Sequence, residues 1–217
     1  MAVTSAGSKG PIISMLGLPG TGKSTQSRLL SEAVEGSLIV SVPLLRKGNP
    51  GLLDRLSQRA RHELDGLAAQ AAAARDLGQL APRAFDHAVI ELVTTSDAPL
   101  TILDGHPKGL LQSQLLLADP TTASRLVVFE FDLGGDSEAR SIDRQRSRAL
   151  SKNQPAGPED LLRFQGKLAT FRTHTLAGLI HLRATAAVHR LDATDDQDSL
   201  HRRILELITK ECADDRR

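Results

Sequence analysis

The sequence has no tryptophan, no tyrosine and a single cysteine, Cys212, in 217 residues. One cysteine excludes a disulfide framework within the chain and a zinc site made of several cysteines. It fits a reducing compartment, and because residues 1–10 contain no apolar signal core, we expect a cytoplasmic protein. Phenylalanine supplies all five aromatic residues, so a bound base would be contacted by phenylalanine or arginine side chains.

A large charge excess and a long apolar run are also missing. The 27 Lys and Arg are balanced by 26 Asp and Glu, which leaves a formal net charge of +1. A general binder of nucleic acids or membrane surfaces would need a large basic excess, and a membrane-spanning helix needs about 20 apolar residues. We therefore expect no nucleic-acid and no membrane partner, and the chain is expected to be a monomer.

Short apolar segments alternate with helical patterns along the whole chain. We predict strands over residues 11–16, 38–42, 100–103, 125–131 and 187–191. We predict helices over residues 25–35, 52–92 with a break near 78–82, 110–117, 136–150, 158–181 and 200–210. This alternation is typical of an α/β fold, here a doubly wound, five-stranded parallel sheet with helices on both faces.

The pattern predicts one domain over residues 11–211, with disordered tails at 1–10 and 212–217. The helical stretch 44–97 is too long for one crossover between parallel strands. We expect it to form a small subdomain over the carboxyl ends of the strands, where open α/β sheets bind ligands.

A phosphate-binding motif follows the first predicted strand. Gly17-Leu18-Pro19-Gly20-Thr21-Gly22-Lys23-Ser24 matches G-x-x-x-x-G-K-[ST] at every fixed position. In such a P-loop the backbone N–H groups surround a phosphate, the lysine reaches the β- and γ-phosphates, and the last hydroxyl binds Mg²⁺. Asp104 follows the third strand as a metal-holding carboxylate would, although Asp104-Gly105 is also an ordinary turn sequence.

At these residues the sequence resembles the adenylate kinase family of nucleoside monophosphate (NMP) kinases. Residues 17–26 match G-x-P-G-x-G-K-G-T-Q except for Ser24, and residues 104–112 (DGHPKGLLQ) match D-G-[FY]-P-R-x-x-x-Q except at His106 and Lys108. Residues 40–46 and 78–82 carry weaker similarity to the segments S-T-G-D-L-L-R and G-x-L-V-P. The resemblance covers nearly the whole chain in order.

The resemblance implies a P-loop kinase with an NMP-binding subdomain at 44–97 and a short lid at 149–158. It implies ATP-dependent phosphoryl transfer, typically to AMP, with Mg²⁺ bound together with ATP by Ser24 and Asp104. The residues that would hold ATP are Gly17, Pro19, Gly20, Thr21, Gly22, Lys23, Ser24, Thr25 and Arg144. Those that would hold the acceptor are Ser41, Arg46, Gly105, Lys108 and Gln112.

Catalysis would depend on positive charge around the transferred phosphoryl group. The resemblance assigns this role to Lys23, Arg144 and Arg148, with Lys167 or Arg163 in the place of a lid arginine. The alternative for the Arg140–Arg148 cluster is a solvated helix face.

Several positions depart from the family pattern. The expected lid contains no R-x-D-D element, and Lys152 is its one basic residue between 151 and 158. Lysine replaces arginine at 108 and at 167, which substitutes a point charge for a planar fork. His106 is interpreted as a ring that packs beside the acceptor, with a pH-tuned catalytic role as the alternative. These departures leave two other hypotheses open: a kinase of a non-nucleotide small molecule, and a nucleotide-binding protein with weakened catalysis.

Overall fold

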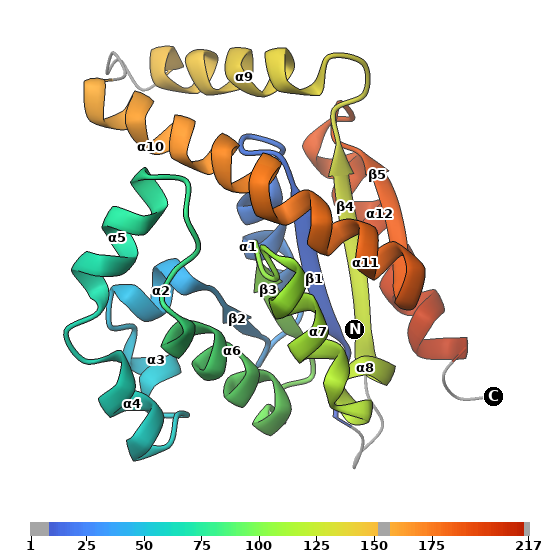
Figure 1. Cartoon of the computed structure of the whole chain (residues 1–217). Helices are drawn as coiled ribbons and strands as arrows, with labels where there is room; N and C mark the ends of the chain where they lie inside the picture. Colours follow the sequence, from blue (N-terminus) through green and yellow to red (C-terminus); the bar gives the residue numbers. More distant parts are fainter. Residues whose placement is uncertain (1–8, 152–156, 215–217) are drawn as a thin grey trace.

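A computed structural model describes residues 9–151 and 157–214. The described residues form a five-stranded, wholly parallel sheet in the order β2-β3-β1-β4-β5 (Figure 1). The strands are β1 (Ile12–Gly17), β2 (Leu38–Val40), β3 (Thr101–Asp104), β4 (Leu126–Asp132) and β5 (Ala187–Asp192). The predicted fold class is therefore confirmed. Because β1 is central, the P-loop that follows it emerges in the middle of the sheet's carboxyl edge.

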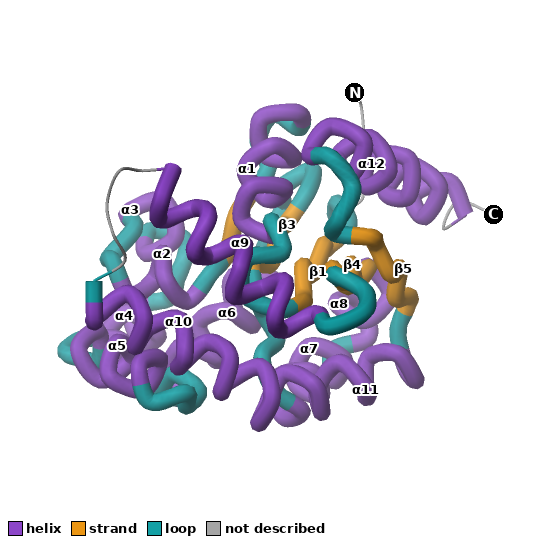
Figure 2. The backbone as a smooth tube through the Cα atoms, turned by 90° about the horizontal axis from the view of Figure 1, so that it is seen from above, coloured by secondary structure: helices purple, strands orange, loops and turns teal. Residues whose placement is uncertain are grey.

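Side chains of β1 alternate between two apolar layers, as a strand buried on both faces requires. Ile13 and Met15 pack with α1 (Lys23–Ala33) and α12 (Gln197–Asp214). Ile12 and Leu16 pack in the opposite layer, which is formed by α6 (Arg83–Thr95), α7 (Leu110–Ala118), α8 (Pro120–Arg125) and α11 (Leu176–Thr185). Figure 2 shows the sheet between these layers.

The remaining helices lie beside β2 or across the carboxyl ends of the strands (Figure 1). The first group consists of α2 (Val42–Arg46), α3 (Pro50–Leu53), α4 (Gln58–Leu64) and α5 (Ala68–Asp76). The second group consists of α9 (Ser137–Ser151) and α10 (Pro158–Thr170). Residues 152–156 lie outside the described residues, and with them Lys152 and half of the expected lid at 149–158.

The helical stretch predicted over residues 52–92 with one break is also interrupted at 54–57 and 65–67. Two further predicted boundaries were wrong for local reasons. The second strand ends at Val40, because Ser41 caps α2 by accepting the Leu44 N–H at 3.3 Å and Pro43 occupies the first helical turn. The helix predicted to end at residue 181 continues to Thr185 through a π-helical segment, η1 (Phe171–Thr175).

Several residues that were assigned to the disordered tails have defined contacts or lie in a helix. The carbonyl oxygen of Gly10 accepts a hydrogen bond from Arg125 Nε at 2.7 Å, and Lys9 Nζ donates to the Thr94 carbonyl at 2.6 Å. At the other end α12 runs to Asp214, and half-buried Cys212 packs against the core. These contacts order residues that were predicted to be disordered. Within the described residues, no helix is both long and apolar enough to cross a bilayer.

Candidate active site

The P-loop links β1 to α1 through glycines in conformations that other residues rarely adopt. Gly17, Gly20 and Gly22 have φ of 142°, 82° and 92°. A Cβ on Gly17 would lie 2.5 Å from the Phe131 carbonyl oxygen, so the loop also requires glycine there for space. Gly22 precedes α1 and has no side chain that could cap it. The first N–H groups of α1 are thus open to an anion, as in other phosphate sites at helix N-termini.

Lys23 folds back over this loop. Its Nζ donates to the carbonyl oxygens of Gly17 at 2.9 Å and Leu18 at 2.6 Å, and to Thr21 Oγ1 at 3.0 Å. The pKa of Lys23 is lowered from 10.5 to about 7, mainly because the side chain is buried. Nearby Asp104 raises this pKa, and two further lysines lower it. The ammonium group is therefore held where a phosphate would stabilise its charged form.

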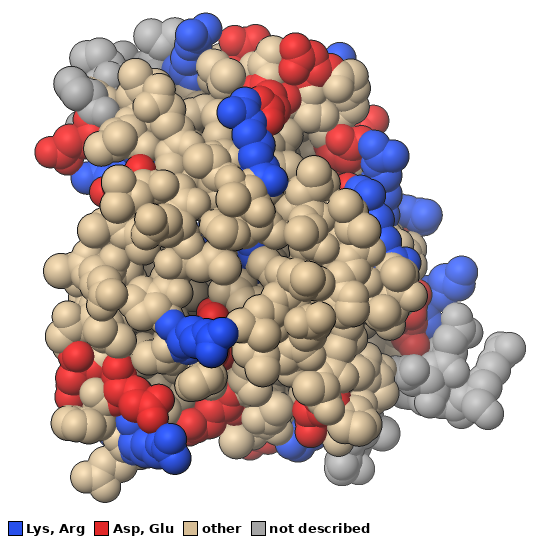
Figure 3. Space-filling model, viewed as in Figure 1, with Lys and Arg blue, Asp and Glu red and all other residues tan. Residues whose placement is uncertain are grey.

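The two further lysines are Lys108, in the loop between β3 and α7, and Lys167, on α10. Burial lowers the pKa of Lys108, and Lys167 lowers it further, while Asp104 raises it. Asp104 is brought to this place by the sheet, because it pairs in register with Met15 of β1. Asp104 therefore lies near Lys23 and Lys108, and Lys167 lies near both of these lysines. Three lysines with one carboxylate leave an excess of positive charge, which favours a polyanion. Figure 3 shows the surface hollowed beneath α10, with basic side-chain atoms in the hollow.

Helix α9 lies directly over the P-loop. Ser141, wholly buried on this helix, donates a hydrogen bond from Oγ to the Pro19 carbonyl oxygen. A Cβ on Gly20 would lie 3.8 Å from the Arg144 Cβ, so the base of the Arg144 side chain is beside the loop. Arg148 lies one helical turn further along α9, but its side chain is outside the described part of the structure.

Part of the Arg140–Arg148 segment of α9 faces solvent, which is the alternative that the sequence analysis gave for these arginines. Arg146 is 76% exposed and pairs with Asp143 at 3.7 Å. The helix thus turns one arginine toward the P-loop and another toward water.

Of the two candidates for the lid arginine, one joins the lysine cluster. Arg163 is paired with Glu159 at 2.9 Å and Asp160 at 3.2 Å on its own helix. Lys167, one turn further along α10, is close enough to lower the pKa values of Lys23 and Lys108. The geometry therefore favours Lys167.

Two of the residues expected on the acceptor side, Gly105 and Gln112, lie beside Lys108, and the polar groups of Gln112 and Ser41 already have partners. Gln112 is 3% exposed; its Nε2 donates to Asp86 Oδ1 at 2.6 Å, and its Oε1 accepts the Lys108 N–H at 2.5 Å. Gly105, with φ of 71°, turns the chain so that a Cβ there would lie 3.8 Å from Lys108 Cε. Ser41 uses its hydroxyl to cap α2, and Arg46 is half-buried in the last turn of that helix.

His106 is 1% exposed and precedes Pro107 through a cis peptide bond. Burial and, to a smaller degree, Lys108 lower its pKa to about 3. A ring with so low a pKa stays neutral near neutral pH, which argues against the pH-tuned catalytic role. Its carbonyl oxygen accepts a hydrogen bond from Ser14 Oγ at 2.7 Å, which ties this loop to β1.

The oxygen donors at the site suit magnesium. Within the described residues no three His, Cys, Asp or Glu side chains form a metal cluster, so a protein cage for a transition metal is absent there. Mg²⁺ needs only one or two protein oxygens when phosphates supply others. The Asp104 carboxylate and the exposed Ser24 hydroxyl at the start of α1 meet that requirement.

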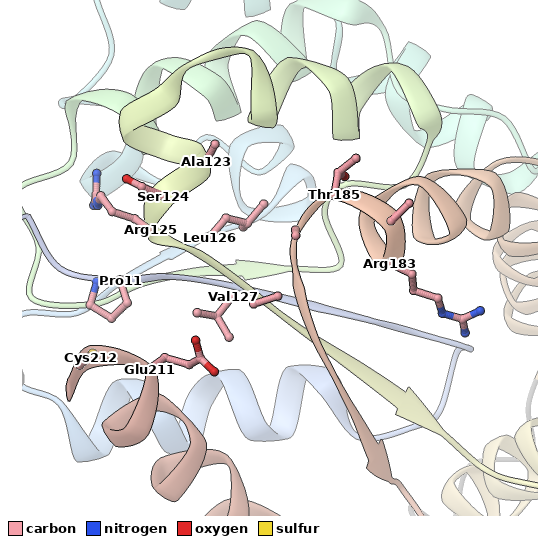
Figure 4. Close-up of a pocket in the computed structure, with 13 residues that line it drawn as sticks. Pro11, Ala123, Ser124, Arg125, Leu126, Val127, Arg183, Thr185, Glu211 and Cys212 are labelled. Carbon is pink, nitrogen blue, oxygen red and sulfur yellow. The ribbon is translucent and has the colours of Figure 1, made fainter. Parts of the chain in front are cut away.

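A separate cavity of about 490 Å³ lies at the opposite ends of β4 and β5 (Figure 4). Its charged residues are largely committed elsewhere: Arg183 pairs with Glu130, and Glu211 pairs with His189 at 2.9 Å. No P-loop residue lines it. The candidate active site is therefore at the carboxyl edge of the sheet.

The sequence analysis missed two residues of the site, Ser141 and Asp86. Asp86 had a detectable signal, because it interrupts the apolar face that Phe85, Val89 and Val93 form on α6. Ser141 had none, since a serine in a polar helix is unremarkable before its neighbours in space are known.

Comparisons with known proteins agree with the motifs. The chain is similar to an adenylate kinase from Rhodopirellula baltica, with 27% identity over 198 residues that cover 90% of this chain and 94% of that protein. No protein-family model matches the chain.

Proposed function

We propose that this protein transfers the terminal phosphoryl group of ATP to the phosphate of a nucleoside monophosphate, with AMP as the acceptor that the motifs imply. The observation that carries the proposal is the proximity of Lys23, Lys108 and Lys167 to one another, with Asp104 close enough to Lys23 and Lys108 to oppose the lowering of their pKa values. These residues come from three separate segments: the start of α1, the end of β3 with the loop that follows it, and α10. Lys23 belongs to the P-loop, and the backbone N–H of Lys108 bonds Gln112. A site for one phosphate group would not need cations from both sides.

In this mechanism the P-loop N–H groups and Lys23 hold the ATP phosphates. Lys108 and Arg46 hold the acceptor phosphate and direct one of its oxygens at the terminal phosphorus of ATP. That oxygen bonds to the phosphorus as the bond to the bridging oxygen breaks, which leaves ADP and a nucleoside diphosphate. The attacking phosphate is already ionised near neutral pH, so no general base is required, and catalysis consists of positioning and charge stabilisation.

Lys167 and Arg144 approach the transferred group from α10 and α9. Their charges would stabilise the oxygens of the phosphoryl group most strongly in the transition state. Ser24 and Asp104 would hold Mg²⁺ with ATP, where the ion supplies further charge neutralisation of the phosphates.

Helix α10 packs closely against the end of α5. A Cβ on Gly166 of α10 would lie 2.2 Å from the Arg75 carbonyl oxygen at the end of α5. A Cβ on Gly78 would lie 2.6 Å from Ala169 Cβ. This contact fixes the helix that carries Lys167, and a fixed charge stabilises a transition state without reorganisation during the reaction.

The proposal is tested by following ADP formation from ATP and Mg²⁺ with each nucleoside monophosphate, with small alcohols and sugars, and with no acceptor. We expect transfer to at least one monophosphate. Lys23→Ala should reduce it by on the order of a hundredfold or more, because a charge that contacts the transferred group is lost. Lys210→Ala, an exposed lysine on α12, is the matched control and should be unaffected. Transfer to an alcohol alone, or nucleotide binding without transfer, would replace the proposal by one of the two other hypotheses.

A further inference from the structure

A buried carboxylate lies next to the residue assigned to the acceptor base. Asp86, on α6, is 5% exposed, and its Oδ1 accepts a hydrogen bond from Gln112 Nε2 at 2.6 Å. Neither the motifs nor the sequence comparison assigns a role to this residue. A buried acid needs a partner for each of its oxygens, because an unpaired buried polar atom is costly.

The orientation of the Gln112 amide is determined by its neighbours. A backbone N–H can only donate, so the Lys108 N–H requires the Gln112 oxygen on its side, at 2.5 Å. The amide nitrogen must then point to Asp86. Flipping the amide would place its oxygen against the carboxylate and its nitrogen against an N–H. Gln112 therefore cannot change its orientation to suit a different base while these two bonds remain.

The second carboxylate oxygen, Asp86 Oδ2, has no hydrogen-bond or salt-bridge partner among the described residues. Four side-chain atoms of the described residues are fully buried and have no hydrogen-bond partner: His106 Nε2, Thr122 Oγ1 and the two terminal nitrogens of Arg125. Asp86 Oδ2 is not among them, so it is not fully buried. An atom that is unpartnered but not enclosed can be reached by a ligand. Gln112 bonds Asp86 through its amide nitrogen and the Lys108 N–H through its amide oxygen, so this carboxylate is linked through one side chain to the loop that carries Lys108.

We propose that Asp86 selects the acceptor base by accepting an N–H hydrogen of an exocyclic amino group at Oδ2, so that a 6-aminopurine monophosphate is preferred to its 6-oxo counterpart. This inference rests on the proposed function. An ionised carboxylate has only acceptor oxygens, so it bonds an amino group and repels a carbonyl oxygen. The remaining Gln112 N–H can donate to the ring nitrogen beside the amino group. A site with a committed hydrogen-bonding group rejects the wrong partner strongly, because its buried polar atom is then left unpaired.

The test compares AMP with IMP, which carries oxygen in place of the 6-amino group. In Asp86→Asn the Oδ1 still accepts from Gln112, so the new NH₂ group takes the place of Oδ2. We expect the wild type to prefer AMP in kcat/KM, and the variant to lower the AMP-to-IMP ratio by at least about tenfold. The KM for ATP should not change. Asp97→Asn, at an aspartate that is 89% exposed, is the matched control and should leave the ratio unchanged.

The same variants are examined by calorimetric titration with AMP and IMP in the absence of ATP. An unchanged AMP-to-IMP ratio in Asp86→Asn, in an enzyme that still phosphorylates monophosphates, overturns the role of Asp86 and leaves the proposed function standing. If no monophosphate is phosphorylated by the wild type, the proposed function fails, and the binding ratio still decides whether Asp86 reads an amino group. Absence of binding by both nucleotides overturns both proposals.

Discussion

The P-loop takes its shape from consecutive residues, 17–25, whereas the acceptor side gathers its side chains from α2, α6, α7 and the loop after β3. In the P-loop the groups that would bind phosphate are backbone N–H groups, and glycines permit their orientation. On the acceptor side the binding groups are side chains that hold one another, as Asp86 and Gln112 do. A site whose binding groups are backbone N–H groups is expected to keep its ligand when nearby side chains are substituted. A site made of paired side chains is expected to change its ligand preference when one of the pair is substituted.

The largest difference between the two regions is expected in kcat when the positive charge of Arg144 on α9 is removed. We predict that Arg144→Ala lowers kcat by on the order of a hundredfold, with a smaller effect on ATP affinity, because a donor to the transition state is lost. Arg146→Ala is the control, since that residue is on the same helix but turned to solvent. Steady-state kinetics with ATP and the acceptor measure both. Equal, near wild-type rates for the two variants would show that α9 contributes no catalytic charge.

A smaller loss of kcat is expected when the positive charge of Lys167 on α10 is removed. Lys167→Ala should lower kcat by about tenfold, because the cation that approaches Lys23 and Lys108 is lost. Arg163→Ala should change kcat little, since its guanidinium is paired with acids of its own helix. Lys167→Arg should retain activity, because the charge is kept. A larger loss in Arg163→Ala than in Lys167→Ala would reverse this assignment.

The contact between α10 and α5 can be tested through stability. Gly166→Ala should lower the free energy of unfolding by about 1–3 kcal/mol, because the new methyl group meets backbone oxygen and the two helices must separate. Gly157→Ala is the matched control, since a Cβ there has no neighbour within 4 Å and its φ is −68°. Urea denaturation gives both values. Similar stability in the two variants would mean that α10 adapts without cost.

The most specific effect concerns the pH dependence at Asp86. Burial raises the pKa of this carboxyl from 3.8 to about 6 in the folded protein, although its bond with Gln112 opposes the change. The neutral form is thus favoured in the fold, so stability is lost as the pH rises from about 4 through 6. Asp86→Asn, which cannot ionise, should be about 1–3 kcal/mol more stable than the wild type at pH 7.5, with a gain that shrinks toward pH 4. A gain that does not depend on pH would contradict this account.

The difference between the two regions also explains which parts of the molecule were predictable. The five strands and the P-loop were visible in the sequence, because local apolar patterns and glycine spacing specify them. The end of β2 was predicted wrongly, because a capping serine and a proline start α2 within the apolar run. Disordered tails were predicted up to Gly10 and from Cys212, but Lys9 and Gly10 bond distant residues, and α12 continues to Asp214.

The sequence by itself determined the parallel α/β sheet, the position of the phosphate loop and the set of basic residues from which a kinase site could be made. Only the tertiary structure decided which cations meet. It brought Lys167 to Lys23 and left Arg163 with its own acids, and it joined Asp86 to Gln112 across two helices. The physical reason is range: backbone conformation and apolar periodicity depend on neighbours in the sequence, whereas charge, burial and hydrogen bonding depend on neighbours in space.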